Sequence, residues 1–319
     1  MQRLLTLVLV LVLALGLASC GAGGENGQTG NGPDAATDPE YPVVVGGTTI
    51  AFRPTRIVSL APSITEKIYD LGHGGRLVGI SYYQGDYPAS LAHMPAFGLA
   101  TRPNIQGILS VNPHLVFSVS ELPLPAMAAL EEAGIPLVIL PSYAQSMSEL
   151  EAIYLNLSMI LDGRTTGRIF GESFRRELNR RIDEIAAEIS YYPPLNAVYL
   201  RALDFTVATG DTLEGQLMER LGFVNIARDQ RNWAFDPEEA VSPEGRELFG
   251  SLDVIFFDPG DQDDPYGTSG VAIGQSTFWQ DINAAHVYID NSIFEIQSMR
   301  LLGQLELMAQ EKQRQFYEE

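Results

Sequence analysis

Aromatic and arginine side chains occur at several points where a strand-like run of the sequence ends. The run RLVGIS leads into Tyr82 and Tyr83, the run VYLRALD carries Arg201, and the loop DQRNWAFDP contains Trp233. Aromatic faces present flat apolar surface, and an arginine can hold a carboxylate or a catecholate through two parallel hydrogen bonds. These residue types therefore indicate a site for a bulky, weakly charged molecule.

The common signatures of catalysis and of a resident metal are missing from the sequence. There is no Gly-x-Ser-x-Gly elbow, no phosphate-binding glycine loop and no Gly-x-Gly-x-x-Gly after the first strand. Ser63 lies at a strand-to-helix bend, but no histidine partner is evident for it. No strand end brings together two of the histidines His73, His93, His114 and His286. We expect a protein that is not an enzyme, with no metal site and no cofactor.

The first half of the chain alternates strands with helices. Strands are predicted over residues 56–60, 76–81, 113–120 and 135–141, and helices over 63–72, 103–112 and 123–134. Strands separated by helices of about ten residues indicate a parallel sheet. Ser63 followed by Glu66 is a capping-box pattern, which predicts that the first helix begins at Ser63.

The middle of the chain is helical, and the alternation then resumes. Helices are predicted over 146–162 and 165–190; strands then follow over 196–202, 205–209, 251–258 and 284–290, with helices over 212–222, 242–250 and from 292 to the end. The helix over 165–190 contains no proline and has an apolar stripe. We therefore expect an α/β fold of two α/β lobes with mainly parallel sheets, joined by one long rigid helix.

The N-terminal residues predict export. Arg3 precedes an apolar run that is too short for a comfortable membrane span, and Leu-Ala-Ser-Cys at 17–20 resembles a bacterial lipobox. The lipobox implies cleavage before Cys20 and lipidation of that residue, the only cysteine in the chain. The predicted organisation is a signal peptide (1–19), a lipidated cysteine with a flexible tether (20–53), an N-terminal lobe (54–145), a helical segment (146–192) and a C-terminal lobe (193–319).

The chain carries a formal net charge of −20, which argues against nucleic acid as a partner. The charge also disfavours anionic ligands unless local arginines offset it. Lys67 and Lys312 are the only lysines, so a cationic site must be built from arginine.

Three stretches together resemble the cobalamin- and iron-complex-binding proteins of ABC importers. They are RIVSLAPSITEKIYDLGHGGRLVGIS, PNIQGILSVNPHLVFS and GQLMERLGFVNI, and the resemblance covers about residues 54–317. It implies two lobes bridged by a helix, with a metal chelate held in the cleft between them. The partners would be that chelate, an ABC permease and, through the lipid anchor, the membrane, with the protein facing the periplasm or the cell exterior.

The resemblance also assigns roles to particular residues. It implies ligand contact by Tyr83 and Phe294, and permease docking by one carboxylate in each lobe. The C-terminal docking position falls on Glu244, whereas the N-terminal one falls on Gln106, where the family usually has glutamate. A glutamine there would weaken docking, because charged hydrogen bonds are roughly twice as strong as neutral ones.

The ligand itself stays open between a ferric siderophore and cobalamin or another corrinoid, with haem as a further alternative. Hydroxamate-siderophore binders often have an arginine where this chain has alanine in GLATRPN, and the arginine here is displaced to Arg102. In different classes, the alternatives are a lipid-anchored hydrolase and an adhesion lipoprotein.

Overall fold

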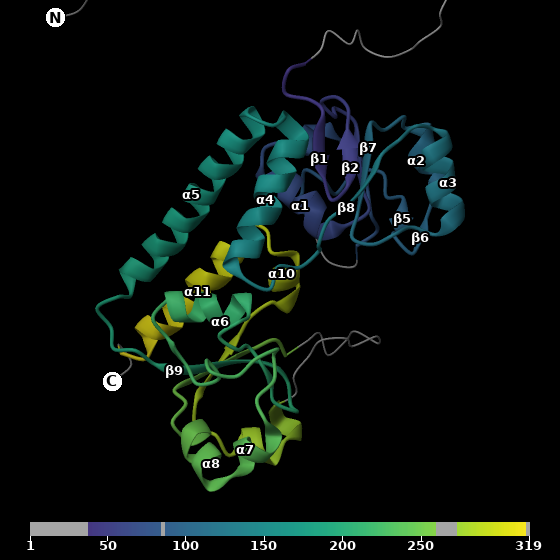
Figure 1. Ribbon diagram of the computed structural model, residues 1–319. Coiled ribbons are helices and arrows are strands. Elements are labelled where there is room, and N and C mark those ends of the chain that lie inside the picture. Colours follow the sequence, from purple (N-terminus) through teal and green to yellow (C-terminus); the bar gives the residue numbers. More distant parts are fainter. Residues whose placement is uncertain (1–37, 84–86, 260–272, 317–319) are drawn as a thin grey trace, which may run out of the picture. The chain divides into compact units, whose positions relative to one another are not determined.

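The computed structural model describes residues 38–83, 87–259 and 273–316, and within them two sheets carry most of the fold (Figure 1). The predicted signal peptide and Cys20 lie outside the described residues. The N-terminal sheet has the strand order β4-β3-β7-β8, and all its neighbours are parallel. Its strands are β3 (Ile57–Ser59), β4 (Leu77–Ile80), β7 (Leu115–Ser118) and β8 (Leu137–Ile139).

Both faces of the N-terminal sheet are buried. In β3, Ile57 belongs to one apolar cluster and Val58 to another, because successive side chains of a strand point to opposite faces. The helices of this lobe are α1 (Pro62–Asp70), α2 (Ile105–Ser110) and α3 (Leu124–Glu132), with a 3-10 turn η1 (Gly74–Arg76). A short antiparallel hairpin, β5 (Gly98–Leu99) with β6 (Arg102–Pro103), lies between β4 and α2 in the chain.

The C-terminal sheet is mixed but mainly parallel. Its order is β10-β9-β12-β13, β11 pairs with β9, and only β10 is antiparallel to its neighbour. The strands are β9 (Asn196–Ala202), β10 (Thr206–Val207), β11 (Val224–Asn225), β12 (Val254–Phe257) and β13 (Ala285–Tyr288). The helices are α6 (Leu213–Arg220), α7 (Pro237–Val241), α8 (Pro243–Gly250), η2 (Ile273–Gln275), α9 (Thr277–Gln280), α10 (Asn291–Ile296) and α11 (Leu301–Arg314).

Two long helices, α4 (Met147–Asp162) and α5 (Thr166–Glu188), connect the sheets and lie side by side (Figure 1). The predicted long helix over 165–190 is therefore confirmed, two residues shorter at its C-terminal end. Its 23 residues extend about 35 Å at 1.5 Å per residue.

One apolar cluster is continuous from the N-terminal sheet to the C-terminal sheet. It contains Ile57 of β3, Leu157 of α4, Ile182 of α5, Tyr199 of β9 and Leu305 of α11, none of which is more than 3% exposed. Interiors of this kind are packed as densely as organic crystals. A large change in the angle between the sheets would therefore have to break close-packed contacts.

Polar contacts reinforce this core between α1 and the segment 296–300, which joins α10 to α11. The carboxylate of Glu66 accepts a hydrogen bond from Ser298 (2.7 Å), and that of Asp70 accepts one from the backbone of Met299 (2.9 Å). Arg300 also lies 3.1 Å from Glu66. Because Glu66 is 1% exposed, these contacts are shielded from water and tie the N-terminal helix to the C-terminal half.

The capping box predicted at the start of α1 is not formed. Ala61 is the N-cap residue and Pro62 occupies the first turn, where its missing N–H leaves no hydrogen bond unmade. Glu66 instead points to Ser298 and Arg300, which are distant in the sequence. The predicted C-terminal helix from 292 is likewise interrupted, because Gln297 adopts a left-handed backbone conformation with φ of 54°.

The N-terminal residues that the structure describes belong to the folded body. Within the predicted tether (residues 20–53), the structure has a hairpin of β1 (Val43–Val45) and β2 (Thr48–Ile50) that packs on α4, so this part of the prediction is wrong. Ahead of the hairpin, Glu40 accepts hydrogen bonds from the backbone N–H groups of Thr165 (2.6 Å) and Thr166 (3.2 Å). Glu40 therefore caps α5 from a distant point in the chain.

The cap depends on a glycine at the turn between α4 and α5. Gly163 has φ of 98°, a conformation that side chains rarely adopt, and a Cβ there would lie 2.3 Å from the Cβ of Glu40. The turn and the cap are thus built together.

In the described part of the chain, no helix combines the length and the apolar character needed to cross a membrane.

We predict that Glu40→Gln lowers the stability of the protein at neutral pH. The hydrogen bond from the Thr165 backbone is the main reason why the pKa of Glu40 lies below its usual value of 4.5. A lowered pKa contributes stability that is present above the unfolded-state pKa and is lost as the pH falls through the folded-state pKa. Urea unfolding should therefore show a lower midpoint for the variant at pH 7 and converging midpoints in acid.

The matched control for this prediction is Glu188→Gln, at the opposite end of α5. A negative charge is unfavourable at a helix C-terminus, so this variant should be neutral or slightly stabilised. Equal losses in both variants would show that Glu40 is not a cap.

Candidate functional site

An aromatic and cationic pair forms the core of the candidate site. Arg201 lies near the end of β9, and its guanidinium carbon is 4.7 Å from the ring centroid of Trp233. At this distance the cation is attracted to the ring face. Arg201 also lies 3.5 Å from the carboxylate of Glu295, which is 59% exposed. Two of the residues predicted from sequence are therefore in direct contact.

Tyr199 supports this pair from inside the sheet. Its ring meets that of Trp233 edge to face at 6.2 Å, and its hydroxyl donates a hydrogen bond to the side chain of Asn291. Phe294 packs edge to face against Tyr199 at 5.3 Å and has no exposed surface. Phe294, which the resemblance implied as a ligand contact, is here a buried support for Tyr199.

The N-terminal lobe contributes Tyr83, which follows β4. Burial raises the pKa of its hydroxyl, and the side chain of Ser292, near the start of α10, opposes this shift. The ring of Tyr83 lies 5.2 Å from that of Tyr87, whose hydroxyl is 2.9 Å from Ser81 Oγ. The same short helix, α10, thus places Ser292 beside Tyr83 and holds Tyr199 through a hydrogen bond to Asn291.

The other two predicted N-terminal residues are exposed at the hairpin beside β4. Tyr82 is 57% exposed, and its backbone N–H donates to Gly98 of β5 at 3.0 Å. Arg102 lies on β6 and is paired with Leu99. Tyr82 and Arg102 are therefore on neighbouring segments of the N-terminal lobe.

A second buried pair was not predicted from sequence. Tyr143, which follows β8, places its hydroxyl oxygen 2.9 Å from both carboxylate oxygens of Glu214 in α6. Glu214 has no exposed surface, and burial raises its pKa to about 7, against the opposing effects of Arg201 and the Tyr143 hydroxyl. Tyr143 could have been found by the rule that located Tyr83, since both follow strands of one sheet.

Ser63, the serine considered for hydrolysis, is 3% exposed, and within the described residues its hydroxyl has no hydrogen-bond partner. It therefore has no base to activate it here. Among the residues that the structure covers, no group of three or more His, Cys, Asp or Glu side chains is arranged to hold a metal ion.

The two predicted docking residues lie at the surface, each in the first turn of a short helix. Gln106 is exposed on α2 and Glu244 is exposed on α8. The α8 helix is capped by Ser242, whose side chain accepts a hydrogen bond from the backbone of Gly245 at 3.0 Å.

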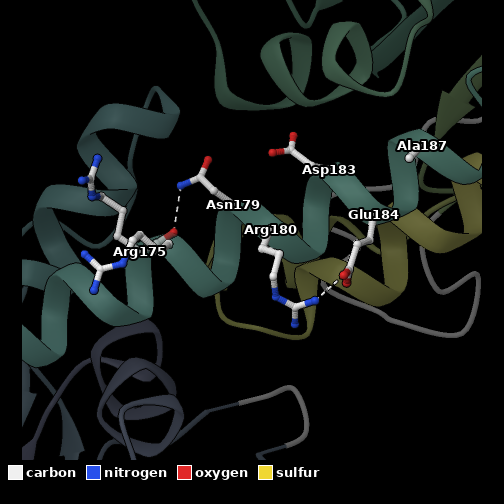
Figure 2. A pocket seen from close by; sticks show the side chains of 7 residues that line it. Arg175, Asn179, Arg180, Asp183, Glu184 and Ala187 are labelled. Carbon is white, nitrogen blue, oxygen red and sulfur yellow. Dashed lines mark hydrogen bonds and ion pairs between the residues drawn. The ribbon is translucent and has the colours of Figure 1, made fainter.

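A shallow hollow of about 500 Å³ on α5 lies apart from these residues. Figure 2 shows Arg180 directed to Glu184 and Asn179 directed to the backbone of Arg175, and Arg180 also pairs with Glu177 at 2.5 Å. The polar side chains that line the hollow thus form ion pairs and hydrogen bonds with one another along α5. The hollow is therefore a solvated ion-pair surface rather than a ligand site.

Two α/β lobes joined by a long helix, with aromatic side chains at the strand ends of both sheets, define the class of two-lobed solute-binding proteins. A family model described as periplasmic binding protein matches residues 57–286, and the chain belongs to that family. The expected fold class and family are thereby confirmed.

Individual similarities agree with this assignment. The chain is 26% identical over 275 residues to the uncharacterized ABC transporter substrate-binding lipoprotein YvrC of Bacillus subtilis, with 82% of this chain and 81% of YvrC covered. It is 27% identical over 180 residues to the vitamin B12-binding protein of Yersinia pestis, with 55% of this chain and 61% of that protein covered.

Among solved structures, a possible iron-binding (periplasmic solute-binding) protein from Staphylococcus epidermidis has a similar fold. The TM-score is 0.61 at 20% identity, and the match covers 81% of this chain and 98% of that one.

We predict that Tyr199→Phe destabilises the protein by about 1–3 kcal/mol, the usual penalty for leaving a buried polar group unpaired. Asn291, which is 3% exposed, would lose the hydroxyl that donates to it. Guanidinium unfolding measures the change.

The control is Tyr191→Phe, at a tyrosine that is 70% exposed and whose hydroxyl donates to Tyr192 at 3.3 Å. We expect a change below about 0.5 kcal/mol, as for most surface substitutions. A loss in the control as large as that in Tyr199→Phe would contradict the supporting role of Tyr199.

Proposed function

We propose that the protein captures a large, weakly charged metal chelate outside the cytoplasmic membrane and delivers it to an ABC permease, with a corrinoid such as cobalamin as the first candidate. The observation that carries the proposal is the Trp233 ring, which is contacted by the guanidinium of Arg201 and by the ring of Tyr199, both on β9. A fixed, partly buried ring provides apolar area without a large loss of side-chain entropy on binding.

Charge favours a neutral chelate over an anionic one. The formal net charge is −20, and Arg201 lies 3.5 Å from the carboxylate of Glu295. A polyanionic ferric complex would meet repulsion with little local compensation. The similarity to a vitamin B12-binding protein supports the same choice.

The ligand would contact both lobes. We assign Trp233 and Arg201 to its C-terminal side and Tyr83 to its N-terminal side, with Tyr82 and Arg102 at the outer edge. Phe294 acts through Tyr199, because its own side chain is fully buried.

Delivery would use Glu244 and Gln106, whose exposure supports a docking role. Lipidation of Cys20 would hold the protein at the membrane, and the name of YvrC as a lipoprotein supports this part of the proposal. The protein would bind without catalysis, because Ser63 is buried and the relatives described above are binding proteins.

The ligand is tested by tryptophan fluorescence, because the chain has two tryptophans in different surroundings. Trp279 is fully buried among Phe205 and Phe249, whereas Trp233 is partly buried at the proposed site. The variant Trp279→Phe, which keeps Trp233, should show saturable quenching by cyanocobalamin.

The matched variant Trp233→Phe keeps Trp279 and should lose most of the quenching, with an affinity about fivefold weaker, as expected for one aromatic contact. Quenching that persists in Trp233→Phe and disappears in Trp279→Phe would place the ligand elsewhere. No saturable response to corrinoids, haem or ferric siderophores would refute chelate capture.

Docking is tested separately from binding. Glu244→Arg should leave the dissociation constant for the chelate unchanged and reduce uptake through the permease by about tenfold or more, because it reverses a charge at the contact. Gln106→Glu should increase uptake, because it restores charge assistance in the N-terminal lobe. Glu247→Arg, at another exposed carboxylate of α8, is the control; equal uptake in both arginine variants would contradict the role of Glu244.

A further inference from the structure

A buried carboxylate lies close to the proposed ligand contacts. Glu214 is the second residue of α6, has no exposed surface, and accepts hydrogen bonds from the Tyr143 hydroxyl at 2.9 Å to each oxygen. Tyr143 follows the last strand of the N-terminal sheet, whereas α6 belongs to the C-terminal half. The pair therefore connects the two sides of the site.

Two charged side chains of the described residues and one phenol act directly on Glu214. Arg201 and Glu295 act on it through their charges, and Tyr143 acts through its hydrogen bond. Burial raises the pKa of Tyr143 and of Tyr199, so both phenols are neutral near pH 7. Among the described residues, Arg201 and Glu295 act by charge on Glu214, and Asp258 acts by charge on the neighbouring Tyr199. Ionisation of Glu214 therefore adds one negative charge to a region that already holds carboxylates.

This arrangement has a consequence for ligand choice. Arg201 is the cation nearest to the proposed ligand, and its side chain is 23% exposed. An ionised Glu214 adds its negative charge to that of Glu295, which already lies 3.5 Å from Arg201. A neutral ligand is indifferent to this balance, whereas an anionic ligand is repelled by about tenfold in affinity for each unit of its charge.

We propose that Glu214, held by Tyr143, is a specificity-determining residue that excludes anionic chelates and leaves neutral chelates unaffected. The inference rests on the proposed function, since it concerns the ligand of the same site. Glu214 acts through the charge of the site and the state of Arg201, without touching the ligand.

The test compares a neutral and an anionic probe on the purified protein at pH 8. Cyanocobalamin is the neutral probe and a ferric tris-catecholate is the anionic one. In Glu214→Gln, the affinity for the ferric catecholate should rise at least tenfold, while that for cyanocobalamin should change less than twofold. Glu247→Gln, an exposed carboxylate on α8, removes the same charge outside the site and should change neither affinity.

The pH profile separates this role from a structural one. In the wild type, protonation of Glu214 removes the repulsion, so the affinity for the ferric catecholate should rise as the pH falls through about 7, near the pKa of Glu214. The profile should be flat in Glu214→Gln. Tyr143→Phe removes the hydrogen bond that favours the ionised form, so the midpoint should move to higher pH.

If Glu214→Gln does not fold, Tyr143→Phe still tests the inference. The quantity measured in that variant is the pH midpoint at which its affinity for the ferric catecholate changes. Equal changes for both probes in Glu214→Gln, or a midpoint unaltered by Tyr143→Phe, would overturn the inference while the proposed function stands. If the wild type binds neither these probes nor any other chelate, the proposed function fails and the inference falls with it.

Discussion

The continuous apolar core between the two sheets is the constraint on which the rest of the structure depends. Leu157 of α4 and Ile182 of α5 are fully buried within it, together with residues of both sheets. Such a core cannot be separated without exposing apolar surface to water. The strand ends of the N-terminal sheet therefore keep nearly the same position relative to those of the C-terminal sheet. The hydrogen bonds from the segment 296–300 to Glu66 and Asp70 add directional contacts to this packing.

The short helix α10 links this constraint to the proposed site. Its first residue, Asn291, accepts a hydrogen bond from Tyr199, the next, Ser292, lies beside Tyr83, and its last, Ile296, accepts a hydrogen bond from the buried Lys67 at 2.5 Å. Lys67 has no exposed surface, and this burial lowers its pKa to about 7. The aromatic residues are therefore placed by a helix whose two ends are both fixed, as a preformed binding surface requires.

The parts of the molecule that follow local patterns could be predicted from the sequence. Alternating apolar strands and helices indicated two lobes, and the proline-free run ending before Pro193 indicated the long helix. The same rule about strand ends gave the prediction that Tyr83 and Arg201 belong to the ligand site. In each case the signal lies within about twenty neighbouring residues. Over that length, the spacing of apolar residues and the residue types at turns are informative.

The parts that depend on distant contacts could not be predicted. Glu66 fits a local capping-box pattern with Ser63. Its actual partners, Ser298 and Arg300, lie more than 230 residues away in the sequence, where no local pattern indicates them. Glu40 belongs to a polar, glycine-rich stretch, and nothing in that stretch indicates that it caps α5. Glu214 looks like any acidic residue in a first helical turn, and only its burial and its bond to Tyr143 distinguish it.

The most direct test of the account is native mass spectrometry of the purified protein after incubation with an equimolar mixture of cyanocobalamin, haemin, a ferric hydroxamate and a ferric catecholate. The account predicts one bound cyanocobalamin per chain and no bound catecholate complex at neutral pH. Retention of the ferric catecholate alone, or of no chelate at all, would contradict it.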